Sequence, residues 1–330
     1  MTDIRGKSIL VIGGAGFIGS HAVEELVAED VKQIIVYDNF ARGVRENLAE
    51  ALKDPRVRVF EVGGDILHTD VLAAAVKESD QVIHLAALWL LQCHEFPRVA
   101  FDVNVRGTFN VLEACRDRGI ERLVYSSSAS VYGDAVQIPM TEEHPFNNRT
   151  FYGATKIAGE AMARAFCDRY GLPYVGLRYM NVYGARQDYK GTYIAVIMKM
   201  LDRIDQGLPP VLYGDGSQAY DFIYVADVGR ANVCALKADA SDSFYNIGSG
   251  TRTSLRELAE LILEITGTQH LGIEYEPAGK TFVTNRIGST AKAMRDLGFQ
   301  SSIDLRSGLA KLIEWRESHK ALVASRAAQA

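Results

Sequence analysis

Residues 8–20, SILVIGGAGFIGS, decide the fold of this chain. The segment begins with SILVI, a continuous apolar run of strand length. Gly13, Gly16 and Gly19 follow, and the helical pattern HAVEELVAED begins directly after them. We therefore expect a buried strand, a tight glycine turn and a helix. In this arrangement the backbone can approach a pyrophosphate, and the helix N-terminus offers unpaired N–H groups to it.

The alternation of apolar strands and helices continues along the chain. Further strands are expected in QIIVYDN, VRVFEVGGDI, QVIHLAA, RLVYSSS and YVGLRYMNVYG. Helices are expected between them, near residues 45–53, 71–76, 102–118 and 152–170. This order predicts an α/β fold, a Rossmann-type doubly wound parallel sheet with right-handed crossovers.

The pattern changes after Gly184, and we expect a smaller, interleaved C-terminal substrate lobe there. Residues 1–183 are predicted to form the domain that carries the glycine turn and binds the cofactor, with residues 220–248 returning a strand and a helix to it. Residues 184–219 and 249–330 are predicted to form the substrate-binding lobe. The Ala-rich tail beyond Ser318 reads as a fraying helix end.

Composition excludes several classes of protein. The 330 residues are 48% hydrophobic and 23% charged, which is typical of a soluble globular protein. A net charge of -5 and the absence of a Lys/Arg block argue against nucleic-acid and membrane-surface partners, and no apolar run is long enough to span a membrane. The four cysteines are far apart and form no CxxC, so we expect reduced thiols and no metal site. With no signal peptide recognised, the expected location is cytoplasmic.

Asp38 identifies the expected cofactor as NAD. It ends the second strand, 19 residues after Gly19. A carboxylate there accepts hydrogen bonds from the adenosine ribose and repels a 2′-phosphate, although the nearby cation Arg42 weakens this preference. The alternative is a purely structural turn with a solvated Asp38. Asp65 and Ile66, after the third strand, are equally consistent with adenine contacts and with a helix cap.

Three residues in the segment from Leu123 to Lys156 form a candidate catalytic set. Tyr152 and Lys156 are four residues apart and share one face of a helix, so the ammonium can lower the pKa of the phenol from its usual value of about 10. Ser128, at the end of a strand, can bridge the phenol and a substrate hydroxyl. A YxxxK pair also arises by chance on helices, so this interpretation depends on the cofactor site upstream.

Two polar residues near these motifs have competing interpretations. His84 follows an apolar strand and reads as a packed core histidine. Asn104 either holds a backbone or water position behind the active site or is an ordinary polar helix residue. The apolar stretch from Trp89 to Cys93 reads as core or lid packing beside a substrate loop.

The motifs together resemble the extended short-chain dehydrogenase/reductase family of nucleotide-sugar epimerases and dehydratases, over Ile9 to about Phe299. They are GGAGFIGS, YDN, GDI, HLAA, NVRGTFNVLEAC, SSSASVYGD, YGATK, RYMNVYG and YGDGSQAYDFIYVAD. The resemblance implies a tightly held NAD, a nucleotide-sugar substrate and a homodimer formed through helices 102–118 and 152–170.

The resemblance also implies two sets of contacts. The residues expected at NAD are Gly13, Gly16, Phe17, Ile18, Gly19, Asp38, Asn39, Asp65, Ile66, Leu85, Ala86, Ala87, Asn104, Ser126, Tyr152, Lys156 and Tyr179. The residues expected at the substrate are Ser128, Ser130, Asn181, Tyr193, Tyr213 and Tyr220.

Within the family, the residues after the catalytic hydroxyl separate the chemistries. The 4,6-dehydratases resemble T-D-E there, the uronate decarboxylases resemble T-S-E, and the 3,5-epimerases and epimerase-reductases place a cysteine at the position of Ser130. Here Ser128 is followed by Ala129 and Ser130, so neither a carboxylate nor a thiol is available for elimination or carbon-acid epimerisation. The stretch is most similar to that of UDP-galactose-type 4-epimerases, which invert C4 through a transient 4-keto sugar.

Several sugars and nucleotides are compatible with the sequence as parts of the substrate. NVYGARQDYKGTYIAVI also resembles 4-epimerases of UDP-N-acetylhexosamines and UDP-uronates. The family's two diphosphate-binding arginines are missing at Tyr220 and near Ala278, and Lys280, Arg286 and Arg186 are the candidate substitutes. The alternative functions are an NAD-dependent dehydratase, dehydrogenase or ketoreductase, and a protein that only senses NAD or a sugar nucleotide.

Overall fold

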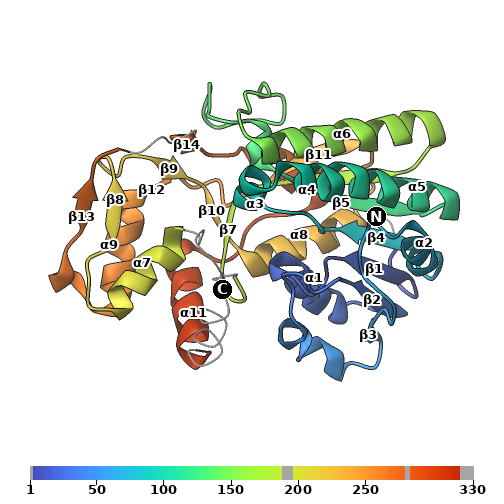
Figure 1. Cartoon of the computed structure of the whole chain (residues 1–330), viewed down its shortest axis with the longest axis horizontal. Coiled ribbons are helices and arrows are strands. Elements are labelled where there is room, and N and C mark those ends of the chain that lie inside the picture. The colour runs from blue at the N-terminus through green and yellow to red at the C-terminus, as the bar shows by residue number, and fades with distance from the viewer. Residues whose placement is uncertain (1–2, 188–195, 279–282, 320–330) are drawn as a thin grey trace.

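The computed structural model describes residues 3–187, 196–278 and 283–319. A parallel sheet covered by helices on both faces forms the larger lobe, and short strands with three helices form a smaller lobe beside it (Figure 1). The α/β Rossmann-type fold predicted from the sequence is confirmed.

The main sheet has seven strands in the order β11-β6-β5-β4-β1-β2-β3, and every neighbouring pair is parallel. The strand order reverses at β1, so β1 and β4 lie at the topological switch point, where open α/β sheets bind ligands beyond the carboxyl ends of their strands. The strands are β1 (Ser8–Ile12), β2 (Gln33–Tyr37), β3 (Val57–Val59), β4 (Gln81–His84), β5 (Arg122–Ser128), β6 (Tyr174–Tyr179) and β11 (Ser243–Ile247).

Both faces of the sheet are apolar because helices cover both. On β1, Ile9 and Val11 pack into one core, and Leu10 and Ile12 pack into the other, as the alternation of a strand requires. The first core lies under α1 (Phe17–Val27), α8 (Val225–Lys237) and α10 (Ala291–Leu297). The second lies under α2 (Thr69–Lys77), α5 (Thr108–Arg118) and α6 (Phe151–Tyr170).

Two expected helices differ from the prediction. The segment 45–53 forms two 3₁₀ turns, Arg45–Leu48 and Ala51–Lys53, in place of one helix. The first turn is tied back to the glycine turn, because Asn47 Nδ2 donates to Ala15 O at 2.9 Å. The helix expected at 102–118 starts earlier: α3 (Leu90–Glu95), α4 (Pro97–Ala100) and a π-helical turn (Phe101–Gly107) precede α5.

Within the described residues, the smaller lobe contains three short sheets and three helices. One sheet pairs β8 (Val211–Tyr213) with β13 (Glu274–Glu276), the second joins β9 (Ala219–Tyr220) to β12 (Thr253–Ser254) and β14 (Asn285–Arg286), and the third pairs β7 (Asn181–Tyr183) with β10 (Phe222–Tyr224). Its helices are α7 (Val196–Asp205), α9 (Leu255–Thr266) and α11 (Leu305–Ser318). Two further 3₁₀ turns span Ala129–Val131 and Gln269–Leu271.

Only part of the segment 220–248 joins the main sheet. β11 forms the edge strand of the main sheet and α8 packs on that sheet, whereas β10 pairs with β7 and Tyr220 belongs to β9. The division into two interleaved domains at 183/184, 219/220 and 248/249 stays a prediction.

The expected fraying tail falls largely on residues 320–330, outside the described residues. Within the described ranges no helix is both long and apolar enough to cross a membrane.

A buried ion pair connects α6 to the centre of the sheet. Arg178 on β6 donates to both carboxylate oxygens of Glu160 on α6, at 2.9 and 2.7 Å, and both side chains are only 4% exposed. Glu160 also accepts from Ser127 Oγ at 2.5 Å, and Arg178 Nη1 donates to Tyr132 Oη at 2.7 Å. The network therefore fixes α6, β5 and β6 relative to one another.

Glu160→Gln is expected to destabilise the protein strongly, because Arg178 then stays buried without its counter-charge. Removing one partner of a buried pair typically costs about 3–5 kcal/mol. The midpoint of chemical denaturation measures the effect. Glu264→Gln, which breaks the exposed pair of Glu264 with Arg306 on the smaller lobe, is the control and should leave the midpoint almost unchanged. Equal shifts for the two variants would contradict this role of the buried pair.

Candidate active site

A cavity of about 900 Å³ opens at the carboxyl ends of the central strands and extends between the two lobes. Every residue predicted to contact NAD lines it, except Asn104. The smaller lobe contributes residues such as Val196, Tyr220 and Leu255 to the same cavity. The sequence pattern and the fold therefore converge on one site.

The glycine turn lies at one wall of the cavity and has no room for side chains. Gly13 has φ +83°, and a Cβ on it would lie 2.8 Å from Ala86 N. A Cβ on Gly19 would lie 2.1 Å from Gly13 O. Gly16 is the N-cap of α1 and no side chain caps the helix, so its first turn is available to an anionic ligand.

Asp38 lies at the end of β2, on the cavity wall, and is only 7% exposed. Burial raises the pKa of its carboxyl group, while the backbone N–H groups of Phe40 and Ala15 donate to it at 2.8 and 2.9 Å and act in the opposite direction. The carboxylate is thus fixed in place, and its remaining acceptor positions suit ribose hydroxyls. The residues present fit a dinucleotide.

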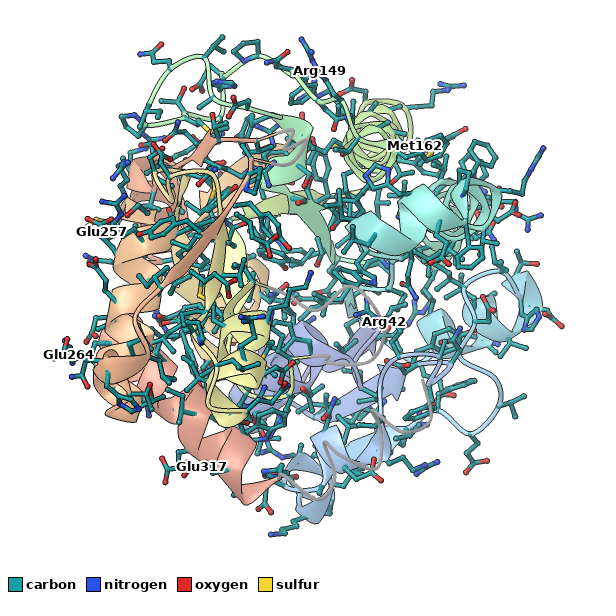
Figure 2. The ribbon with its side chains drawn as sticks, turned by 60° about the vertical axis from the view of Figure 1, so that its left-hand side comes forward. Arg42, Arg149, Met162, Glu257, Glu264 and Glu317 are labelled. Carbon is teal, nitrogen blue, oxygen red and sulfur yellow. The ribbon has the colours of Figure 1, made fainter. Side chains whose placement is uncertain are left out.

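Arg42 also lines the cavity, and its guanidinium lies 5.0 Å from the centre of the Trp89 ring. Figure 2 shows Arg42 in the middle of the molecule, between the N-terminal ribbon and the smaller lobe. Glu257, Glu264 and Glu317 lie at the outer edge of that lobe in the same view. A cation is therefore held inside the site while these three acidic side chains lie at the outside.

The three candidate catalytic residues come together as predicted by their spacing. Ser128 is the last residue of β5, and Tyr152 and Lys156 lie on the first turns of α6. Thr150 caps this helix by accepting from Gly153 N at 3.0 Å. Lys156 Nζ lies 5.7 Å from the centre of the Tyr152 ring, and a hydrogen bond joins Ser128 to Tyr152.

The electrostatics of this set correct one expectation. Burial raises the pKa of Tyr152 to about 12, and the groups that oppose it are the Ser128 hydrogen bond and the charges of Arg42 and Arg286. Lys156, predicted to lower this pKa, instead donates from Nζ to Ser126 O at 2.7 Å. Burial lowers the pKa of Lys156 itself to about 8.

Asn104 acts behind the cavity wall and does not line it. Its Oδ1 accepts from Leu88 N at 2.7 Å, and its Nδ2 donates to Leu88 O at 3.0 Å and to Thr155 Oγ1 at 3.1 Å. It therefore holds the loop after β4 against α6, which matches the backbone-holding interpretation, while its contact with NAD stays a prediction. It lies in the π-helical turn, a feature often found at functional sites.

Among the described residues, only two of those predicted to contact the substrate line the cavity. Asn181 and Tyr220 line the cavity, while Ser128 and Ser130 lie next to it, joined by a hydrogen bond from Ser130 N to Ser128 Oγ at 3.1 Å. Tyr213 is 56% exposed on β8 and does not line the cavity. On that strand Leu212 is buried, so its neighbour Tyr213 points to the opposite face. Tyr193 lies outside the described residues.

The cavity is also lined by residues outside the two predicted sets of contacts. Trp89, Leu255 and Phe222 line the cavity. Arg186, one of the candidate arginine substitutes, lines it as well. It forms an ion pair with Glu24, and its buried Nη1 atom has no hydrogen-bond partner in the described ranges. Its φ of +67° could not be foreseen from a single sequence. Of the other candidate arginine substitutes, Lys280 lies outside the described residues, and Arg286 is on β14.

His84 has a structural role. It is 2% exposed, its Nε2 lies 3.1 Å from Thr108 Oγ1, and burial together with the charge of Lys156 lowers its pKa to about 3. It is therefore a neutral core histidine, as its position after an apolar strand suggests. No group of three or more His, Cys, Asp or Glu side chains able to hold a metal ion occurs in the described part of the chain.

Comparison with known proteins now decides the family. A profile described as the NAD dependent epimerase/dehydratase family matches residues 9–248. The chain belongs to this family. The predicted resemblance is thereby confirmed, and NAD is the cofactor of the family that the glycine turn and Asp38 fit.

The relatives include epimerases and dehydratases. A putative UDP-glucose 4-epimerase from Methanocaldococcus jannaschii is 36% identical over 94% of this chain and 99% of its own length. A UDP-N-acetylglucosamine 4-epimerase from Methanobrevibacter ruminantium, solved with UDP-N-acetylmuramic acid, has a TM-score of 0.89 at 30% identity, covering 96% of this chain and 99% of that one. The dTDP-glucose 4,6-dehydratase DesIV from Streptomyces venezuelae, solved with NAD, has a TM-score of 0.86 at 30% identity, covering 96% and 98%.

The low pKa of Lys156 predicts how this residue affects stability at different pH values. Its pKa is about 8 in the folded protein, against an ordinary lysine value of 10.5, so the unfolded chain binds the extra proton between these values. Stability from this group should therefore rise with pH from about 8 to 10.5. The difference in unfolding free energy between the native protein and Lys156→Met should move in favour of the native protein as pH rises from about 7.5 to 9.5.

Denaturation at several pH values measures this difference. Lys53→Met, which changes an exposed lysine, serves as the control and should give a constant difference. A constant difference for Lys156→Met as well would contradict the burial of the Lys156 charge.

Proposed function

We propose that this protein is an NAD-dependent 4-epimerase of a nucleotide-activated hexose, of the UDP-glucose/galactose, N-acetylhexosamine or uronate type. The observation that carries the proposal is the assembled Ser128, Tyr152 and Lys156 set beside a neutral Ser130. The chain covers nearly the full length of the relatives named as 4-epimerases.

The side chains supply proton transfer and orientation. Bound NAD⁺ supplies the hydride acceptor and returns the hydride later. Tyr152 accepts the proton of the C4 hydroxyl as that carbon becomes a ketone, and gives it back when the hydride reaches the opposite face. Ser128, hydrogen-bonded to Tyr152, orients the C4 oxygen, and Lys156 places a positive charge beside the phenol.

The nearby acidic groups favour epimerisation over dehydration. Elimination of water needs an acid and a base close to the reacting carbons, but Ala129 and Ser130 provide neither. Glu142 accepts from Asn246 N at 2.8 Å, and Asp134 accepts from Thr284 N at 2.8 Å. Both carboxylates thus support neighbouring backbone. An NAD-dependent dehydrogenase or ketoreductase remains the alternative, because the same set serves a net redox reaction.

The two lobes divide the binding in this proposal. Residues 1–183 with 220–248 hold NAD, and residues 184–219 with 249–330 hold the sugar nucleotide. The cavity supports this division, because Gly16 and Asp38 line it from the larger lobe, while Val196 and Leu255 line it from the smaller one. Arg186 is the proposed diphosphate ligand, since it lines the cavity and its buried Nη1 atom has no partner within the residues that the structure describes.

We also propose that two copies associate through α5 and α6. These helices lie side by side on the outer surface of the larger lobe (Figure 1). Large apolar side chains are exposed there and on the adjoining π-helical turn, an arrangement that marks interaction sites. They are Phe101, Phe109, Phe151 and Tyr170, which are 50%, 41%, 45% and 53% exposed. A cytoplasmic location is proposed from the four free thiols.

Tyr152→Phe removes only the phenolic hydroxyl and should lower the rate of C4 inversion by about 10²–10⁴-fold. NAD should still copurify, and turnover of the unaltered enzyme should produce no net reduced nicotinamide absorbance. Chromatography of the UDP-glucose/galactose, N-acetylhexosamine and uronate pairs measures the inversion. Tyr213→Phe, on the exposed face of β8, is the control and should retain activity. Unchanged properties in Tyr152→Phe would favour a sensing protein, and steady net reduction of NAD would favour a dehydrogenase.

Phe109→Asp should shift the protein from dimer toward monomer, because it places a charge in the proposed apolar interface. Light scattering coupled to size exclusion measures the mass. Met294→Asp is the control, since Met294 is 58% exposed on α10, which covers the opposite face of the sheet. A monomeric native protein, or a dimer unaffected by Phe109→Asp, would argue against this interface.

A further inference from the structure

Arg286 carries a charge that the described part of the chain leaves unpaired. Its Nε atom is buried and has no hydrogen-bond partner among the described residues. Its guanidinium makes no hydrogen bond or ion pair with any residue in 3–187, 196–278 or 283–319. Burial lowers the pKa of this guanidinium, which is the sign of a charge lacking adequate compensation. Arg286 as a whole is partly buried, and only its Nε atom is fully covered. A charge in such a position is normally paired, so a ligand is the natural source of the missing anion.

The nearest acid does not supply that anion. Asp134 acts electrostatically on Arg286 but forms no ion pair with it. Its carboxylate is occupied by the backbone N–H groups of Thr284 at 2.8 Å and Asn285 at 3.0 Å, and by Thr284 Oγ1 at 2.9 Å. Asp134 therefore fixes the strand that carries Arg286 and leaves the guanidinium to another partner.

The backbone around Arg286 is held from both sides. Its carbonyl accepts from Asp221 N at 2.9 Å, and the next carbonyl, of Ile287, accepts from Met140 N at 2.8 Å. A Cβ on Gly288 would lie 2.2 Å from Met180 Cε, so the segment packs tightly against the larger lobe. The guanidinium is thus attached to a rigid support, which is what specific recognition requires.

Arg286 does not itself line the cavity, but it is next to a strand residue that does and it acts electrostatically on the catalytic phenol. It pairs in register with Tyr220, which lines the cavity. Arg286 and Tyr152 each shift the pKa of the other, so the cation is close to the phenol that faces the C4 oxygen in the proposed reaction. On a nucleotide-linked hexose, the substituent on C5 is next to C4, whereas the diphosphate is on C1, across the ring.

We propose that Arg286 binds a carboxylate on C5 of the sugar, so that the substrate is a nucleotide-linked hexuronate. A guanidinium binds a carboxylate through two parallel hydrogen bonds, a geometry that lysine cannot reproduce. A neutral hydroxymethyl group at the same place would leave the buried charge unpaired. This inference rests on the proposed epimerase function and adds to it the class of sugar.

The test compares an acidic pair, UDP-glucuronate and UDP-galacturonate, with a neutral pair, UDP-glucose and UDP-galactose. The native enzyme should have a kcat/KM for the acidic pair at least ~100-fold above that for the neutral pair, as expected for a buried charge pair. Arg286→Gln should reduce this ratio ~100-fold or more, and Arg286→Lys should restore it only in part. The ratio is the informative quantity, because loss of Arg286 also raises the pKa of Tyr152 and slows both pairs by a common factor.

Arg186→Met is the matched control. It removes an arginine that lines the cavity and whose buried Nη1 atom has no partner among the described residues, and it should weaken both pairs and UDP alone by a similar factor. Arg286→Gln should leave UDP binding unchanged and should not lower the thermal stability of the ligand-free protein, since it removes an unpaired buried charge. These two readouts separate a recognition role from failure to fold.

Each remaining outcome counts against the inference. A native enzyme that prefers the neutral pair refutes the carboxylate while leaving the epimerase function intact. An unchanged ratio in Arg286→Gln, with weaker binding of UDP, assigns Arg286 to the diphosphate instead. If neither pair undergoes C4 inversion although NAD copurifies, the proposed function fails and the inference fails with it.

Discussion

The fold depends on the close approach of three backbone segments at the glycine turn. Gly13 touches the loop after β4, and Gly19 on α1 lies against the carbonyl of Gly13, at separations that exclude any Cβ atom. This contact sets how near α1 comes to the switch point of the sheet. The N-terminus of α1, Asp38 and the ends of β4 and β5 all lie next to this contact and line the cavity. The position of the cavity therefore depends on residues 13 and 19 being glycines, which have no Cβ atom.

The charge of the site is opposite to that of the chain. The protein has a net charge of -5, yet the cations Arg42, Lys156 and Arg186 line the cavity. A further cation, Arg286, acts electrostatically on the phenol of Tyr152 in that cavity. Burial lowers the pKa of Lys156 and of Arg286 and raises the pKa of Tyr152. A site of this kind attracts anionic ligands by its field and gains compensation when they bind. Anionic cofactors and substrates are therefore part of its electrostatic balance.

Sequence predicts those features that local spacing determines. The strand, glycine turn and helix at 8–27, Asp38 at the end of β2, and Tyr152 with Lys156 on one helix face all follow from short-range patterns. Arg286 and Tyr220 become neighbours only through the pairing of β14 with β9, which no local pattern encodes. The substrate contact expected of Tyr213 stays a prediction. Its side chain is exposed on β8 and does not line the cavity, and the direction in which a residue of a short strand faces is not given by its motif. Asn104 depends on a π-helical turn that periodicity does not reveal.

The strand order has a consequence during synthesis of the protein. β6 and β11 are neighbours in the sheet, although 63 residues separate Tyr179 from Ser243 and most of the smaller lobe's first segment lies between them. Until β11 leaves the ribosome, β6 is an open edge whose six residues are all buried in the finished protein. Such an edge can pair with other chains. The nascent protein is therefore most exposed to aggregation after its cofactor half is complete, and closure of the sheet waits for residue 247.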